Sequence, residues 1–212
     1  MSKAAVDLAA ARIEEAARQQ VGPLIVAIDG RSGTGKSTLA KAPARRLPAV
    51  VIEGDNFHAG GTGIKGDPPS ARAARCPLHP LARTEFGVVR FAAGSSSPLP
   101  RLRLEGLDGS LARTATRIDP APIIVLEGVY AARPELRDLL HLCILVRVPE
   151  AQRQARLIAR EGTLGPWELQ WHQAEAWYFA HAAPLAAFDL VLNLDQAGAG
   201  PGWTRPRAAA GG

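Results

Sequence analysis

The chain has 212 residues, of which 47% are hydrophobic and 21% charged, and its net charge is +5 with a pI of about 9.8. This length and composition are typical of one globular domain with a single core. They exclude a membrane-spanning helix, because no apolar run approaches the roughly 20 residues that a bilayer requires.

Targeting and disulfide signals are missing from the sequence. The N-terminal segment has no continuous apolar stretch, and Asp7, Glu14 and Glu15 fall in a helical pattern, so we expect no signal peptide and a cytoplasmic location. Two cysteines give no disulfide framework, and Cys143 lies in an apolar run where we expect it to be buried.

A basic pI can indicate a nucleic-acid surface. Here the arginines are scattered among acidic residues and alanines, form no block and are not interleaved with aromatic residues. We attribute the charge to an Ala/Arg/Gly/Pro-rich composition and to a site for anionic ligands. Neither nucleic acid nor a membrane is an expected partner.

The first elements in chain order are a helix and a buried strand around a glycine-rich turn. Residues 4–20 have helical periodicity, and the apolar run 24–28 suits a buried parallel strand. Residues 30–35 form a glycine-rich turn, and a helix is predicted over residues 36–47. Pro43 lies inside that helix and should kink or shorten it, because an interior proline costs roughly 3 kcal/mol.

The remaining elements alternate between strands and helices, which predicts βαβ units and a parallel sheet covered on both faces. The predicted strands are residues 50–53, 123–126, 142–148 and 188–194, and the predicted helices are residues 134–140, 150–160 and 167–181. We expect residues 1–194 to form one α/β domain with a five-stranded parallel sheet. The Gly/Ala/Pro-rich residues 195–212 are predicted to be disordered.

The turn after the first strand carries the strongest signal in the chain. Gly30, four further residues and Gly35-Lys36-Ser37 match the phosphate-binding P-loop pattern G-x-x-x-x-G-K-[ST]. Its amides can surround phosphate oxygens at the positive end of the following helix. Lys36 can reach the β and γ phosphates, and Ser37 can ligate Mg²⁺. We expect a P-loop NTPase fold, ATP and Mg²⁺, and the nucleotide-binding residues Gly30, Arg31, Ser32, Gly33, Thr34, Gly35, Lys36, Ser37 and Thr38.

Two carboxylates follow predicted strands and are candidates for chemistry. Asp55 comes just after residues 50–53, where it could accept a proton from an acceptor hydroxyl or help to hold Mg²⁺. A solvated turn aspartate beside Gly54 and Asn56 is an equal alternative from spacing alone. Glu127 closes the apolar run "IIVLE" and should face the crevice at the carboxyl end of the sheet, where it could hold Mg²⁺ through water.

These stretches together resemble the uridine kinase-like branch of P-loop kinases, which is related to phosphoribulokinase and pantothenate kinase. The resemblance rests on "AIDGRSGTGKSTLA", "EGDNFHAGG", "IIVLEGVYAARPELRDLL" and "RLIAREG", and covers residues 24–75 and 118–194. It implies an ATP-dependent kinase in which Asp55, followed by the aromatic Phe57, is the base for the acceptor hydroxyl. It also implies a small lid whose arginines, best matched by Arg156 and Arg160, meet the transferring phosphate.

The remaining candidates carry weaker signals. Arg153, Arg156 and Arg160 share one helix face, where exposed arginines are usually solvated, although the helix break over residues 162–166 favours a mobile lid. Phe57 and His58 are candidates for acceptor binding, but a lone loop histidine is usually just exposed. Helical spacing relates four residues, which indicates core packing: Trp167, Trp171, Ala174 and Tyr178.

The middle segment, residues 71–117, departs from the family pattern. Related kinases place acidic and aromatic residues here to bind the acceptor, whereas residues 76–107 are rich in Arg, Pro, Ser and Leu, with Glu85 and Glu105 as the acids. We hypothesise that this stretch was replaced or scrambled, for example by compensating frameshifts, and translation of the gene in its other frames tests this. Divergence toward another acceptor is the competing explanation.

The sequence therefore predicts an ATP-dependent small-molecule kinase, with a nucleoside such as uridine or cytidine as the preferred acceptor. Two alternatives stay open. One is a kinase for another metabolite, such as pantothenate or a sugar phosphate. The other is a nucleotide-binding protein whose acceptor site is lost or altered. The unusual middle segment favours this alternative.

Overall fold

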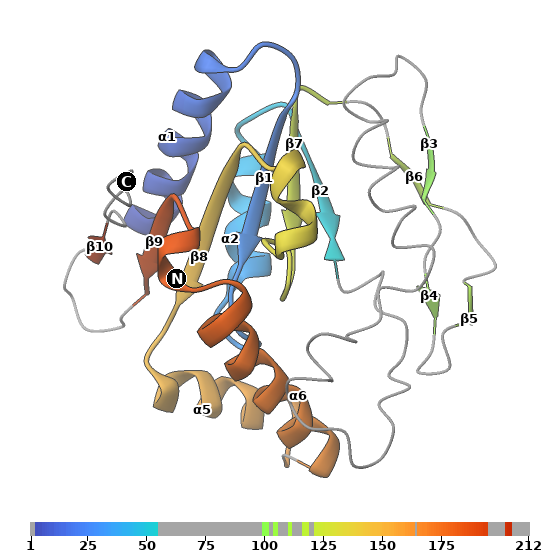
Figure 1. The fold of residues 1–212 in the computed structure, drawn as a ribbon, viewed down its shortest axis with the longest axis vertical. Helices are drawn as coiled ribbons and strands as arrows, with labels where there is room; N and C mark the ends of the chain where they lie inside the picture. Colours follow the sequence, from blue (N-terminus) through green and yellow to red (C-terminus); the bar gives the residue numbers. More distant parts are fainter. Residues whose placement is uncertain are drawn as a thin grey trace.

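A parallel β-sheet forms the centre of the computed structural model, which describes residues 3–54, 121–163, 165–194 and 202–204 and four short strands between residues 99 and 118 (Figure 1). The strand order is β10-β9-β8-β1-β7-β2. All neighbours pair in parallel except β10, which is antiparallel to β9. The predicted five-stranded parallel sheet is confirmed in β1 (Leu24–Asp29), β2 (Ala49–Glu53), β7 (Ile123–Glu127), β8 (Leu142–Arg147) and β9 (Leu190–Asn193).

The predicted helices are present, with small differences at their ends. The helices are α1 (Lys3–Gln19), α2 (Lys36–Ala44), η2 (Pro134–Leu139), α5 (Glu150–Glu161), α6 (Pro166–Trp177), η3 (Tyr178–Ala182) and η4 (Leu185–Ala187). Helix α2 ends one residue after Pro43 rather than at residue 47, as expected for a helix shortened by an interior proline. The predicted helix 167–181 continues from α6 into the wider π-helical turn η3.

The two faces of the sheet are buried by different helices. Alternate strand residues, such as Val26 and Ile144, pack with apolar residues of α1 and α2. The residues between them, such as Ala27 and Cys143, pack with η2, η3 and the segment after β7. Burial on both faces explains why these strands are continuous apolar runs. Cys143 is a buried free thiol, as predicted, and burial raises its pKa to about 11.

Short strands lie outside the main sheet. β3 (Leu99–Arg101) pairs with β6 (Thr116–Ile118), and β4 (Leu104–Glu105) pairs with β5 (Ser110–Leu111), both antiparallel. In the C-terminal segment, Gly202–Thr204 form β10 on the edge of the sheet. None of the helices within the described residues has the length and apolar character needed to cross a membrane.

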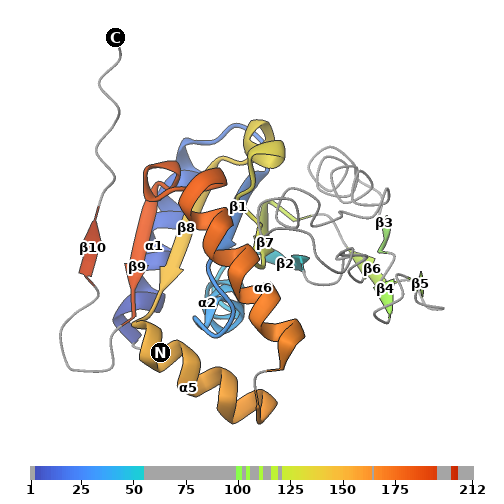
Figure 2. The same ribbon diagram turned by 60° about the horizontal axis from the view of Figure 1, so that its bottom comes forward.

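The carboxyl ends of the parallel strands gather at one edge of the sheet. The turn before α2 leaves β1 there, and α5 follows β8 across the same edge (Figure 2). Helix α6 then returns beside the sheet toward η3 (Figure 2). Because ligands of open α/β sheets bind at this edge, it holds the candidate active site.

Candidate active site

The glycine-rich turn between β1 and α2 lies at the centre of the site. The Thr34 N–H and the Thr34 hydroxyl both bond to the Arg31 carbonyl, at 3.2 and 2.8 Å, and so close a tight turn. Helix α2 begins at Lys36, so the amides of its first turn have no acceptor within the helix. These amides and the positive end of the helix dipole can bind an anion.

Two glycines allow the loop to lie against its neighbours. A Cβ on Gly30 would stand 2.5 Å from the Val146 carbonyl oxygen of β8. Gly33 has φ +82°, and its Cβ would stand 3.0 Å from the Arg153 carbonyl oxygen and 3.1 Å from Leu157 Cγ. Helix α5 therefore rests directly on the loop, which any other residue at position 33 would push away.

Ser37 and Glu127 meet at the front of the loop. The Ser37 hydroxyl donates to Glu127 Oε1 at 3.0 Å, and Glu127 is 3% exposed. Glu127 ends β7, where it pairs in register with Ile28 of β1 and Glu53 of β2. A hydroxyl and a carboxylate at this distance fit a Mg²⁺ ion, which prefers oxygen ligands.

Asp29, the last residue of β1, is buried beneath the loop and was not among the candidates from the sequence. Its Oδ1 accepts the N–H groups of Gly30 at 2.7 Å and Tyr130 at 3.2 Å. Its Oδ2 accepts the Ala132 N–H at 2.9 Å and the Tyr178 hydroxyl at 2.8 Å. Asp29 therefore joins the start of the P-loop to the segment after β7 and to η3.

Burial has the largest effect on the pKa values of Asp29 and Tyr178. It raises the pKa of Asp29 to about 6, against the lowering effects of the hydrogen bonds from Ala132, Tyr178 and Gly30 and of the Lys36 charge. Burial and the adjacent carboxylate raise the pKa of Tyr178 far above its ordinary value. The phenol therefore keeps its proton and donates to Asp29.

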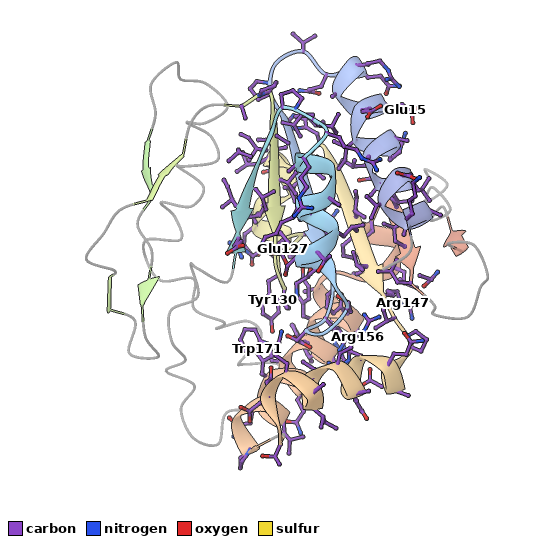
Figure 3. The ribbon with its side chains drawn as sticks, turned by 180° about the vertical axis from the view of Figure 1, so that it is seen from behind. Glu15, Glu127, Tyr130, Arg147, Arg156 and Trp171 are labelled. Carbon is purple, nitrogen blue, oxygen red and sulfur yellow. The ribbon has the colours of Figure 1, made fainter. Side chains whose placement is uncertain are left out.

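Aromatic rings continue the site from Glu127 toward α6 (Figure 3). Tyr130 has φ +71°, a conformation uncommon for a bulky residue. Its ring packs edge-on against Trp171, at 5.7 Å between ring centroids, and against Tyr178 at 4.6 Å. Tyr178 and Ala174 are buried and Trp171 is partly buried against the core, as their helical spacing predicted.

The three arginines of α5 have different surroundings. Arg153 is 2% exposed and donates to Glu150 and to the Ser32 carbonyl oxygen, the latter at 3.2 Å. Its hydrogen bond lowers the pKa of Glu150 to about 2. Arg156 lies against the loop, with Nη1 3.4 Å from the carbonyl oxygens of Gly33 and Thr34 (Figure 3). Arg160 is exposed and paired with Glu161.

Several predicted site residues lie outside the described part of the chain. These are Asp55, Phe57 and His58. Gly54, the residue before Asp55, is described, and a Cβ placed on it would stand 3.1 Å from the Glu127 carbonyl oxygen. The roles of Asp55, Phe57 and His58 stay predictions.

Sequence reasoning missed Asp29 and Glu175. Asp29 ends a buried strand, and the argument applied to Glu127 could have found it. Glu175 stands between buried Ala174 and Tyr178, and an acidic residue on an apolar helix face was the signal for it. Its carboxylate accepts both the Ser32 N–H, at 3.0 Å, and the Ser32 hydroxyl.

The strand order, the P-loop and the crossing helix α5 give this chain a P-loop NTPase fold. Among solved structures it is similar to a "Possible Uridine Kinase" from Bacillus stearothermophilus, with a TM-score of 0.61 and 18% identity over 85% of this chain and 97% of that one. It is also similar to a "putative fructose transport system kinase" from Silicibacter sp. TM1040, with a TM-score of 0.57 and 23% identity over 82% of this chain and 94% of that one. No protein-family model and no curated protein sequence matches the chain.

The pKa of Asp29 predicts a pH dependence of stability. A carboxyl whose pKa is raised to about 6 on folding, from an ordinary 3.8, stabilises the fold below pH 3.8 and loses this contribution as the pH rises through 6. The difference corresponds to roughly 3 kcal/mol. Urea unfolding of wild type and Asp29→Asn should show the wild type losing about this much relative to the variant between pH 4 and pH 7. A difference that is constant with pH would contradict the assignment.

The contact between Gly33 and α5 predicts a matched pair of substitutions. Gly33→Ala and Gly22→Ala place a methyl group at φ +82° and φ +94°, but Gly22 has open space around it. Both variants should lose about 1–2 kcal/mol for the positive φ. Gly33→Ala should lose more, because its methyl group meets α5, and thermal denaturation measures the difference. Equal losses would show that α5 does not rest on the loop.

Proposed function

We propose that the protein is an ATP-dependent small-molecule kinase that transfers the γ-phosphate of ATP to a hydroxyl group with the help of Mg²⁺. The observation that carries the proposal is the 3.0 Å hydrogen bond between Ser37 at the start of α2 and Glu127 at the end of β7. It joins a P-loop hydroxyl to a buried carboxylate at the edge where kinases of this fold bind ligands. The similar structures, described as a "Possible Uridine Kinase" and a "putative fructose transport system kinase", support the same class of reaction.

The residues fit Mg²⁺ and the phosphates of ATP. In kinases Mg²⁺ is held by one or two carboxylates and substrate phosphates, and it offsets the phosphate charge when bound. Ser37 would ligate it directly and Glu127 through water. The amides of Gly33 and residues 35–37 and the Lys36 ammonium would bind the β and γ phosphates.

Asp55 is the proposed base. Chain connectivity keeps it one peptide from Gly54, which lies against the backbone of Glu127. From there its carboxylate would orient the acceptor hydroxyl and accept its proton. Positioning and electrostatic stabilisation would supply most of the catalysis, as in other phosphoryl transfers.

The arginines of α5 would complete the charge around the moving phosphate. Arg156 is the stronger candidate, because it lies beside the P-loop carbonyls. Arg160 is paired with Glu161 on the surface and would need to turn inward to act. A closing movement of α5 would bring it there and exclude water.

The acceptor is proposed to be a small molecule, with a nucleoside such as uridine or cytidine preferred. The fold is shared with a protein described as a "putative fructose transport system kinase", so a sugar is the second acceptor class to test. ADP release measured with a panel of nucleosides, sugars, sugar phosphates and pantothenate would identify the class. ATP binding without product from any of them would instead support a nucleotide-binding protein that does not transfer phosphate.

Lys36→Ala should abolish phosphate transfer and weaken ATP binding, because the variant lacks the ammonium that would face the phosphates. Coupled ADP-release assays and calorimetric ATP titration measure the two effects. Lys41→Ala is the matched control on the same helix, since Lys41 is exposed and pairs with Glu53 at 3.1 Å. Transfer that survives in Lys36→Ala at the level of the control would exclude the proposed phosphate site.

Asp55→Asn should bind ATP as tightly as the wild type but turn over orders of magnitude more slowly, because an amide cannot accept the acceptor proton. Single-turnover kinetics with a saturating acceptor measure the chemical step. If the variant transfers phosphate at the normal rate, Asp55 is not the base.

A further inference from the structure

Glu175 is a buried carboxylate that the proposed transfer chemistry does not use. It lies on α6 and is 0% exposed. A charge removed from water is strongly destabilising unless other groups pair with it. Its partners are therefore informative about why an acidic residue stands there.

The partners of Glu175 connect α6 to the P-loop. Glu175 Oε1 accepts the Ser32 N–H at 3.0 Å and the Ser32 hydroxyl. The indole N–H of Trp171, one helical turn earlier on α6, donates to the same Ser32 oxygen at 3.2 Å. Ser32 is thus held by both its backbone and its side chain.

Two arginines balance the charge of Glu175. Its Oε2 lies 3.6 Å from Arg31 Nε and 3.8 Å from Arg153 Nη1. Both arginines also pair with Glu150 of α5, at 3.3 and 2.6 Å. The four side chains form a closed ring of alternating charge that contacts the loop at Arg31 and Ser32.

We propose that Glu175 is a positioning residue that holds the P-loop in its phosphate-binding conformation before the nucleotide arrives. The effect on ATP affinity rests on the proposed function, whereas the effect of Glu175 on the conformation of the loop does not. A loop that is already ordered binds its ligand without the entropic cost of ordering, so loss of Glu175 weakens binding.

Charge alone predicts the opposite effect. A carboxylate beside the loop repels the phosphates of ATP, so removing it would tighten ATP binding on electrostatic grounds. Weaker binding in Glu175→Ala therefore identifies a positioning effect. Glu175→Gln removes the same charge but keeps an oxygen that can accept from Ser32, and it is the rescue variant.

Hydrogen exchange of the ligand-free full-length protein tests the hold on the loop directly. In Glu175→Ala the Thr34 amide, whose bond to the Arg31 carbonyl closes the loop, should exchange about tenfold faster than in the wild type, while the core strands β1 and β8 exchange as before. Glu175→Gln should stay within about threefold. Ser32→Ala, which keeps the buried charges in place, should give a smaller increase than Glu175→Ala. Gln173→Ala, exposed on the same helix, is the control.

Titration with Mg²⁺·ATP provides the second test, which measures the affinity of each variant for the nucleotide. Glu175→Ala should raise the Kd about tenfold, and the double variant with Ser32→Ala should bind no more weakly, because the two residues act through one contact. Unchanged loop exchange in Glu175→Ala, a faster exchange spread equally over β1 and β8, or equal or tighter ATP binding would overturn the inference. A wild type with a protected loop that does not bind ATP would overturn the proposed function and leave the positioning role intact.

Discussion

A loop that binds phosphate through its main-chain amides has to be held from the side that faces away from the phosphate. In this protein that support comes from three directions. Asp29 receives the Gly30 N–H from below, α5 packs on Gly33, and α6 holds Ser32 through Glu175 and Trp171. The conformation of residues 30–35 depends on these contacts, and the proposed chemistry depends on that conformation.

The same contacts place buried charges around a site for an anionic ligand. Asp29 and Glu175 are both fully buried; Asp29 accepts four hydrogen bonds, and Glu175 accepts two from Ser32. Arg31 and Arg153 compensate Glu175, so the support for the loop adds little net negative charge near the phosphates. Because the arginines offset this negative charge, buried carboxylates can support the loop without preventing it from binding a polyanion.

Local patterns predicted the strands, the helices and the P-loop, because apolar runs and the G-x-x-x-x-G-K-[ST] spacing involve residues that are close together in the sequence. The supporting contacts were not predicted, since Ser32 and Glu175 are far apart in sequence and only the fold joins them. Helical spacing likewise placed three arginines on one face of α5. Because only part of α5 overlies the loop, Arg153 is buried, Arg156 touches the loop and Arg160 is exposed.

The most direct test of the account is a crystal structure with Mg²⁺ and a non-hydrolysable ATP analogue. The account predicts the β and γ phosphates at about 3 Å from the amides of Gly33 and residues 35–37, and Mg²⁺ bound by the Ser37 hydroxyl in place of its hydrogen bond to Glu127. The Asp55 carboxylate should face the γ-phosphate across the acceptor site. A nucleotide bound elsewhere, or a Ser37–Glu127 hydrogen bond that persists with no metal beside it, would contradict it.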